Sequence, residues 1–268
     1  MRAWPGSRPV GTLPAVRTGL AAALADLLLP RVCAGCGVPG AVLCRPCASS
    51  LAVPHLAQPR RFPAGFPPTV AAGRYAGPVR PAVNAFKEHG RAELARPLGA
   101  ALALAVAAVR SGLDDPGAPV LLVPVPSSAA ALRARGRDHV RELAARAATE
   151  LRAAGVPASV ARLLRRVGRA RDSAGLTAAE RRANLAGTLR LRPGALPPGA
   201  ALVVVDDVVT SGATLTAAAG VLAPLAAPGG PPVLAAVVAA TPRRTPRGTS
   251  PGKPHRARDR LSGQGGGD

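Results

Sequence analysis

Two adjacent carboxylates, Asp206 and Asp207, follow an apolar run in the C-terminal part of the chain. Residues 201–205 are all apolar and include three valines, which predicts a central strand that is buried on both faces and closed by the acids. An acid pair that merely ends a strand would look the same, and so would the acidic strand of a P-loop nucleotidase. The nucleotidase needs an upstream glycine-rich loop ending in Gly-Lys-Ser or Gly-Lys-Thr, and neither Lys87 nor Lys253 stands in one.

The residues after the acid pair form a turn of small and hydroxyl-bearing side chains, and a helix is predicted from residue 214. A glycine-containing turn at a helix N-terminus presents N–H groups and a positive dipole, which suit a phosphate. Two acids beside such a turn are costly unless they bind something, such as ribose hydroxyls or a hydrated Mg²⁺. We therefore predict a ribose 5-phosphate site, with the phosphate on the turn and the diol on the acids. The turn comprises Val208, Val209, Thr210, Ser211, Gly212, Ala213 and Thr214.

A second apolar run, residues 120–125, also ends in a polar turn. It predicts another strand, and the carboxyl ends of strands are where an open parallel sheet binds its ligands. A plain proline-rich strand exit is the alternative interpretation. The turn comprises Val125, Pro126, Ser127 and Ser128.

The elements that must position these turns alternate between strands and helices, which predicts an α/β fold with an open, mostly parallel sheet. Residues 132–154 predict one helix with a buried stripe at Leu143, Ala147 and Leu151. Short apolar stretches predict strands at 160–164 and 233–239.

Four cysteines lie within fifteen residues, as two C-x-x-C pairs separated by seven residues. Two such pairs let four thiolates converge on one Zn²⁺, and Gly35 and Gly37 help the first pair to turn. Redox chemistry would need one motif on a βαβ unit, and disulfides would need an oxidising compartment that no signal supports. We therefore predict a structural zinc finger. Its ligands are Cys33, Cys36, Cys44 and Cys47.

Positive charge is unevenly distributed along the 268 residues, whose formal net charge is +21. Residues 130–192 hold fifteen arginines and five acids, whereas most of the rest of the excess lies in the two ends of the chain. A polyanionic ligand is one interpretation, and a compositional bias toward arginine is the other. None of the five aromatic residues lies beyond Phe86, which argues against modules that bind single strands by stacking bases.

Composition also predicts the division of the chain. We predict a disordered head over residues 1–19, a helix and the zinc finger over 20–60, an α/β domain over 61–240 and a disordered basic tail over 241–268. No apolar run reaches the ~20 residues that span a bilayer, and residues 20–29 make a poor signal sequence. The expectation is a cytoplasmic protein without a membrane span.

The stretch VVVDDVVTSGAT, residues 203–214, resembles the PRPP-binding motif of the phosphoribosyltransferase superfamily. Together with the cysteine pairs it resembles the ComF family, which is associated with competence for DNA uptake, over about residues 24–240. The resemblance implies a type I phosphoribosyltransferase fold that binds PRPP with Mg²⁺. It implies that Asp206 and Asp207 hold the ribose hydroxyls, that residues 210–214 bind the 5-phosphate, and that residues 125–128 lie beside the pyrophosphate.

Further stretches carry the same resemblance, namely residues 27–33, 75–90, 121–128 and 180–185. Charged side chains in or near them are predicted to contact the ligand: Lys87, Arg135, Arg181 and Arg182. The chain departs from the family at residues 135–139, where Arg-Gly-Arg-Asp-His replaces Arg-Gly-Phe-Asn-Gln, and at Ser173, where a glutamine is expected. These departures leave the acceptor open, and His139 is predicted to lie on a helix surface.

Two functions remain at this point. The first is a phosphoribosyltransferase of unknown acceptor, in which a nucleophile displaces pyrophosphate from C1 of PRPP. The second is a protein of the competence machinery that handles single-stranded DNA or serves as a scaffold, beside a competence helicase and with a vestigial transferase site.

Overall fold

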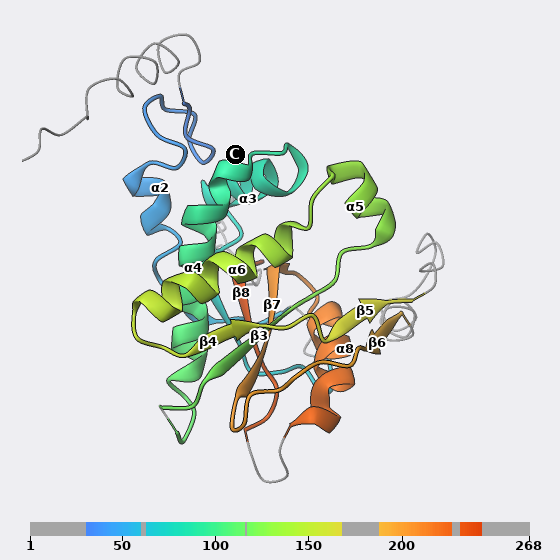
Figure 1. Cartoon of the computed structure of the whole chain (residues 1–268). Coiled ribbons are helices and arrows are strands. Elements are labelled where there is room, and N and C mark those ends of the chain that lie inside the picture. Colours follow the sequence, from blue (N-terminus) through green and yellow to red (C-terminus); the bar gives the residue numbers. More distant parts are fainter. Residues whose placement is uncertain (1–30, 60–62, 116, 168–187, 227–230, 243–268) are drawn as a thin grey trace, which may run out of the picture.

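A six-stranded sheet forms the centre of the molecule, in the order β1-β2-β8-β7-β3-β4 (Figure 1). The computed structural model describes residues 31–59, 63–115, 117–167, 188–226 and 231–242. Five strands pair in parallel, and β1 pairs antiparallel with β2 at one edge. The strands are β1 (His55–Leu56), β2 (Thr69–Arg74), β3 (Val120–Pro124), β4 (Ala158–Val160), β7 (Ala201–Val209) and β8 (Leu234–Ala240).

Helices cover both faces of this sheet, and the alternation of buried side chains along the strands explains why. In β7, Val203 and Val205 pack toward the helices of one face, whereas Leu202 and Val204 pack toward the helix on the other. The first face carries α3 (Val79–Glu88), α4 (Ala95–Arg110) and α6 (His139–Ala153), and the second carries α8 (Ala213–Leu222). Every residue of β3 and β8 is buried, as expected for central strands.

The chain leaves the neighbouring strands β3 and β7 in opposite directions. From β3 it passes through α5 (Ala129–Arg135) and α6 to β4, whereas from β7 it passes through α8 to β8 on the other side. The loops after the two strands therefore diverge and leave a crevice at their carboxyl ends. Such a switch point is where open α/β sheets bind their ligands.

The structure corrects three details of the predicted elements. The single helix predicted over 132–154 is two helices, because Gly136 takes a left-handed φ of +67° that ends α5, and Asp138 caps α6. The strand predicted to close at the acid pair runs through it to Val209. The strand predicted at 160–164 is divided into the end of β4 and the start of β5 (Leu164–Arg166), which pairs with β6 (Leu189–Leu191).

The cysteine-containing segment packs directly on the α/β unit. The fit is close, because a Cβ on Gly73 of β2 would lie 2.5 Å from the carbonyl oxygen of Ser50, just after α2 (Arg45–Ser49). Leu51 belongs to the main core, and Arg91 donates a hydrogen bond to the carbonyl of Val32 at 2.9 Å. Strand β1 belongs to the segment assigned to the zinc finger, yet it extends the central sheet.

One helical stretch in the described part of the chain, Ala92–Arg110, is long and apolar enough to cross a membrane. It consists of the 3-10 turn Ala92–Leu94 and α4. More than half of it is buried inside the protein, where α4 packs against β2, β8 and α6. This is the position of a core helix in a soluble protein.

Candidate functional site

A cavity of about 590 Å³ opens at the switch point between β3 and β7. Its walls include both predicted turns, since Val125, Pro126, Ser127 and Ser128 contribute from one side and Thr210 and Thr214 from the other. Asp206 and Asp207 lie between them, at the end of β7. The structure thus brings together the acid pair and two turns that are about 80 residues apart in the sequence.

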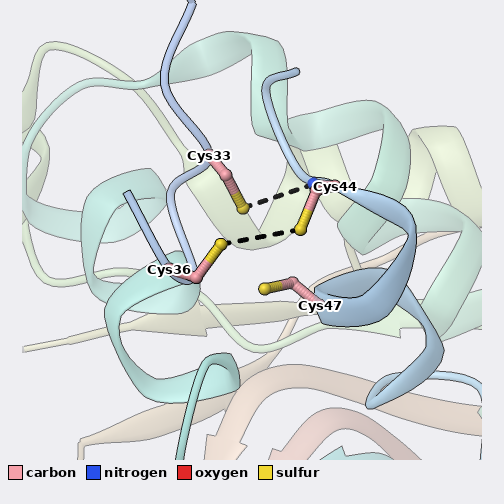
Figure 2. A group of neighbouring side chains, drawn as sticks. All are labelled: Cys33, Cys36, Cys44 and Cys47. Carbon is pink, nitrogen blue, oxygen red and sulfur yellow. Dashed lines mark hydrogen bonds between the residues drawn. The ribbon is translucent and has the colours of Figure 1, made fainter. Parts of the chain in front are cut away.

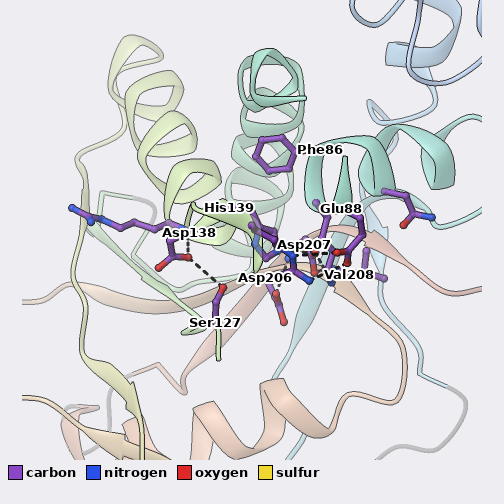
Figure 3. A network of polar contacts seen from close by, with 12 residues as sticks. Phe86, Glu88, Ser127, Asp138, His139, Asp206, Asp207 and Val208 are labelled. Carbon is purple, nitrogen blue, oxygen red and sulfur yellow. Dashed lines mark hydrogen bonds and ion pairs between the residues drawn. The ribbon is translucent and has the colours of Figure 1, made fainter. Parts of the chain in front are cut away.

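Asp207 is buried and held by donors on both carboxylate oxygens. Lys87 Nζ lies 2.9 Å from Asp207 Oδ2. His139 Nε2 lies 3.0 Å from the same oxygen (Figure 3). The backbone N–H of Val208 donates to Asp207 Oδ1 at 2.7 Å. A buried carboxylate with this many partners is anchored, and it fixes the end of α3 and the start of α6 against β7.

Asp206 differs, because one of its oxygens is available to a ligand. Asp206 Oδ1 accepts a hydrogen bond from the N–H of Asp207 at 2.9 Å. Among the residues that the structure describes, Asp206 Oδ2 has no hydrogen-bond donor, although the side chain lines the cavity. The two acids therefore differ in role. Asp207 is bonded to other residues of the protein, whereas Asp206 presents a hydrogen-bond acceptor to the cavity.

The pKa values of the pair move in opposite directions. Burial, together with the charge of Asp207, raises the pKa of Asp206 well above its ordinary value. Burial acts on Asp207 in the same sense, but the hydrogen bond from His139 and the charge of Lys87 outweigh it and hold the pKa of Asp207 well below its ordinary value. Asp207 in turn raises the pKa of Lys87 against the effect of that residue's burial. Asp207 is thus the ionised member of the pair.

His139 is not on the helix surface where the sequence analysis expected it. It is 3% exposed, and its ring stands edge-on to Phe86 with the ring centres 6.3 Å apart. The prediction failed because the partner of His139, Asp207, lies 68 residues further along the chain. The ring nitrogen Nδ1 is buried without a hydrogen-bond partner within the described structure.

Arg135, predicted to contact the ligand, lines the cavity, but its guanidinium is already engaged. It donates to both carboxylate oxygens of Glu88, at 3.2 and 3.0 Å. Arg137 stacks on the ring of Phe86 at 4.2 Å and pairs with Glu142. Both arginines therefore hold the end of α3, which carries Lys87, in place.

The loop at 210–214 turns at a glycine and leads into the N-terminus of α8. Gly212 takes a left-handed φ of +78°, and a Cβ there would lie 2.8 Å from the ring of Phe66, so this position requires glycine. Gly212 is also the N-cap of α8, whose first turn directs N–H groups at this edge of the sheet. Ser211 Oγ accepts from the N–H of Ala213 at 3.4 Å, while Thr210 and Thr214 face the cavity.

The turn at 125–128 is held from both sides. Val125 donates its N–H to the carbonyl of Val205 at 3.0 Å, Ser128 caps α5, and Arg166 Nε donates to the carbonyl of Pro126 at 2.8 Å. All described peptide bonds, including Val125–Pro126, are trans.

Other residues of the cavity were not singled out from the sequence. Tyr75 and Asn84 line it and hydrogen-bond to each other at 2.6 Å, and Glu88 and Arg166 line it as well. Their isolated positions carry no motif of their own. Arg181, Arg182 and Ser173 lie outside the described residues, as do the predicted head and all but the first two residues of the predicted tail.

The four cysteines converge as predicted, with all four sulfurs within 4.8 Å of one another (Figure 2). Tetrahedral Zn–S bonds of about 2.3 Å place the sulfurs about 3.8 Å apart. The sulfurs of Cys36 and Cys44 lie 3.6 Å apart. The cluster can hold one structural metal ion such as zinc. Gly37 turns with a φ of +78°, whereas Gly35 is needed because a Cβ there would lie 2.8 Å from the sulfur of Cys47.

The protein environment already favours one thiolate in this cluster. The backbone N–H groups of Gly35 and Cys44 point at the sulfur of Cys33, at 3.4 and 3.3 Å. Burial opposes ionisation of Cys33, but these and other backbone hydrogen bonds lower its pKa to about 6. Burial and the neighbouring thiols raise the pKa of Cys47. The remaining thiols would ionise when a cation binds, because thiol ligands must lose their protons to hold a metal ion.

Comparison with known proteins adds no identification. A scan against protein-family models finds no match, and a search of the curated proteins finds no match either.

Proposed function

We propose that the cavity at the switch point binds PRPP together with Mg²⁺, and that the protein is a phosphoribosyltransferase. The observation that carries the proposal is the juxtaposition of an ionisable acid pair, a glycine-capped helix N-terminus and the 125–128 turn around one cavity. A ribose 5-phosphate has a charge to place on the helix N-terminus and hydroxyls to place on Asp206. Its C1 pyrophosphate then faces the 125–128 turn, near Lys87.

The reaction would be a substitution at C1 of the ribose. The lone pair of an acceptor forms the new bond to C1, the bond from C1 to the pyrophosphate oxygen breaks, and pyrophosphate leaves with the electron pair. The acceptor loses its proton to solvent or to a base. Positioning and charge neutralisation are the protein's part in such chemistry. Lys87, which is partly exposed beside the acid pair, supplies positive charge to the leaving group.

The donor set fits Mg²⁺ carried by the substrate. Mg²⁺ prefers oxygen ligands and keeps several of its waters, and Asp206 presents a carboxylate oxygen at the cavity wall. Asp206 would hold the ion, and the ion would neutralise negative charge on the substrate. A bound cation beside Asp206 also favours the ionised form that burial disfavours.

We further propose that the fold is that of a type I phosphoribosyltransferase with a ComF-like zinc finger, in which Cys33, Cys36, Cys44 and Cys47 hold Zn²⁺. The cysteine spacing and the convergence of the four sulfurs support zinc. The strand, acid pair and glycine turn around β7 support the transferase fold. A link to DNA uptake rests on the resemblance alone.

Calorimetric titration with PRPP and Mg²⁺ tests the proposal. Asp206→Asn removes the carboxylate that a bound cation would ionise and keeps the side-chain shape, so we expect PRPP to bind at least about tenfold more weakly. Asp114→Asn is the matched control, because Asp114 is exposed and lies before β3, at the opposite edge of the sheet. The absence of heat with the wild-type protein, or equal affinity in both variants, would refute PRPP binding.

A role in handling single-stranded DNA is the second candidate, and three exposed arginines favour it, namely Arg133 of α5 and Arg162 and Arg165 of the 161–166 segment. Base stacking gets no support, because Phe66, Tyr75 and Phe86 are the aromatic residues of the described structure and none is exposed. Binding to DNA would therefore rest on phosphate contacts and would fall steeply with salt.

A further inference from the structure

A second cavity, of about 730 Å³, lies beside the first. The two share the turn Pro126, Ser127 and Ser128 and the side chain of Arg166. The far walls of the second cavity come from α5, from the segment between β4 and β5, from β5, and from the residues that flank β6. We call it the arginine cavity, because its lining includes Arg133, Arg162, Arg165, Arg166 and Arg192.

The arginine cavity has one acid against five cations. That acid is Asp138, which already accepts from the N–H of Arg141 at 3.3 Å and lies 3.5 Å from Ser127 Oγ. Arg166 is committed to the carbonyl of Pro126. The remaining four arginines, Arg133, Arg162, Arg165 and Arg192, have no ion-pair partner among the described residues.

This charge balance is unlike that of the first cavity. There Lys87 and Arg135 each face a carboxylate, from Asp207 and Glu88 respectively. Like charges gathered around one hollow repel one another, and a bound anion removes that repulsion. Guanidinium groups are also the donors that match phosphate and carboxylate geometry with paired hydrogen bonds.

We propose that the arginine cavity is a second anion-binding site, for a small organic molecule that carries phosphate groups. A volume of about 730 Å³ is that of a pocket for a small ligand. Ser128 and Thr188 add hydroxyls to the lining, and Leu132 and Leu164 give an apolar patch for an organic part. No aromatic side chain of the described structure lines it, which disfavours a stacked single strand.

The site does not depend on PRPP in the first cavity. If PRPP does bind there, the second anion lies across the shared 126–128 turn from the pyrophosphate, and Arg166 adjoins both ligands. Arg166 also interacts electrostatically with the acid pair. Burial lowers the pKa of Arg166, and the charge of Asp206 opposes that lowering. The second ligand would then be placed as a phosphorylated acceptor or effector of the same protein.

Calorimetric titration of the full-length protein with inorganic pyrophosphate tests the site, at a constant ionic strength of about 150 mM to screen loose surface binding. The test variant is Arg165→Ala with Arg192→Ala, two exposed positions in the arginine cavity and outside the first one. The matched control is Arg80→Ala with Arg96→Ala, which removes the same charge from exposed positions on α3 and α4. Far-ultraviolet circular dichroism checks that all three proteins are folded.

We expect the test variant to lose one pyrophosphate site, or to bind there at least about tenfold more weakly, while the control keeps the wild-type isotherm. An unchanged test variant, an equal loss in the control, or no binding to the wild-type protein would overturn the proposal. A titration with an oligothymidylate runs in parallel, and a loss confined to the oligonucleotide would assign the cavity to nucleic acid instead. Failure of the PRPP site is distinguishable, because Asp206→Asn alters PRPP binding and leaves the arginine cavity intact.

Discussion

The cysteine cluster and the acid pair are both groups of side chains that become negative on ionisation, and they differ in where the compensating charge comes from. Around the acid pair the protein supplies it, through Lys87 on Asp207, where His139 adds a hydrogen bond. Around the cysteines the sulfur of Cys33 is met by backbone N–H groups, and the four sulfurs face one another. The cysteine cluster is thus arranged so that a cation from outside can neutralise its thiolates, whereas the acid pair has a cationic partner within the protein.

This difference teaches what each region is able to do. A closed tetrahedral set of four thiolates has no position left for a substrate, so a metal ion held there would be structural. The acid pair retains one open acceptor, Asp206 Oδ2, at the wall of a cavity. The acid pair, in which Lys87 neutralises Asp207 and Asp206 keeps an open oxygen, is therefore the region suited to bind and release a ligand.

Metal removal should have the largest effect on the stability of the protein. Binding of a structural zinc contributes on the order of 10 kcal/mol, and residues 31–54 have little core of their own. We expect a strong chelator to lower the melting temperature by about 10 °C or more, because Leu51 and the contact of Ser50 with Gly73 tie this segment to the sheet. Thermal unfolding followed by circular dichroism measures the shift, and elemental analysis should find about one zinc per chain.

The control for metal removal is a Cys33→Ala, Cys36→Ala variant, which should melt at the lower temperature and respond no further to the chelator. An identical melting temperature with and without the chelator in the wild-type protein would contradict a structural metal.

Removing the carboxylate of Asp207, which compensates the charge of Lys87, should have the next largest effect on stability. Asp207→Ala leaves Lys87 and His139 facing a buried gap, and removing one partner of a buried ion pair costs about 3 kcal/mol. We expect that loss in the free energy of unfolding from urea titration. Adding Lys87→Met should restore part of it, because no uncompensated ammonium group then remains.

The role of His139 in this pair is tested by His139→Gln, which keeps a donor toward Asp207 and removes the unpartnered Nδ1. A much smaller loss is expected than for Asp207→Ala. If Asp207→Ala costs less than about 1 kcal/mol, the ion pair is not the anchor that the geometry indicates.

The sequence was sufficient for what is local. The apolar run of β7, the acids at its end, the glycine turn after it and the cysteine spacing all depend on residues within about twenty positions, and each of them is found as an element or cluster. Lys87 was predicted to contact the ligand because it lies in the 75–90 stretch, and its ammonium group contacts Asp207 of the acid pair. The break at Gly136 was missed, because a glycine within an otherwise helical pattern does not by itself reveal a left-handed φ.

What the sequence could not predict is set by topology. His139 meets Asp207 across 68 residues, and Arg135 meets Glu88 across 47. The arginine cavity draws its lining from four separate segments that only the strand order brings together. Charge composition indicated that the 130–192 stretch is basic, but which arginines are paired and which are open is decided by the fold.

Neutralising Asp206 should have the smallest effect on stability, and the opposite sign. Its folded pKa lies above the unfolded value of about 3.9, so the charged form is disfavoured in the folded protein. The carboxyl group of Asp206 therefore contributes stability that is fully present below its pKa in the unfolded chain. That contribution is lost as the pH rises through its pKa in the folded protein. At neutral pH, Asp206→Asn should therefore raise the free energy of unfolding, by about 1 kcal/mol, while it weakens PRPP binding.

Urea titrations of the wild type and Asp206→Asn between about pH 4 and pH 8 measure this gain, which should grow with pH and vanish near the unfolded pKa. Asp114→Asn, at an exposed position, should show no such trend. A variant that is less stable than the wild type at neutral pH would mean that Asp206 is a second anchor like Asp207. A variant that is more stable but binds no ligand would separate the two acids, because it would show that the charge of Asp206 is retained for the ligand at the expense of the fold.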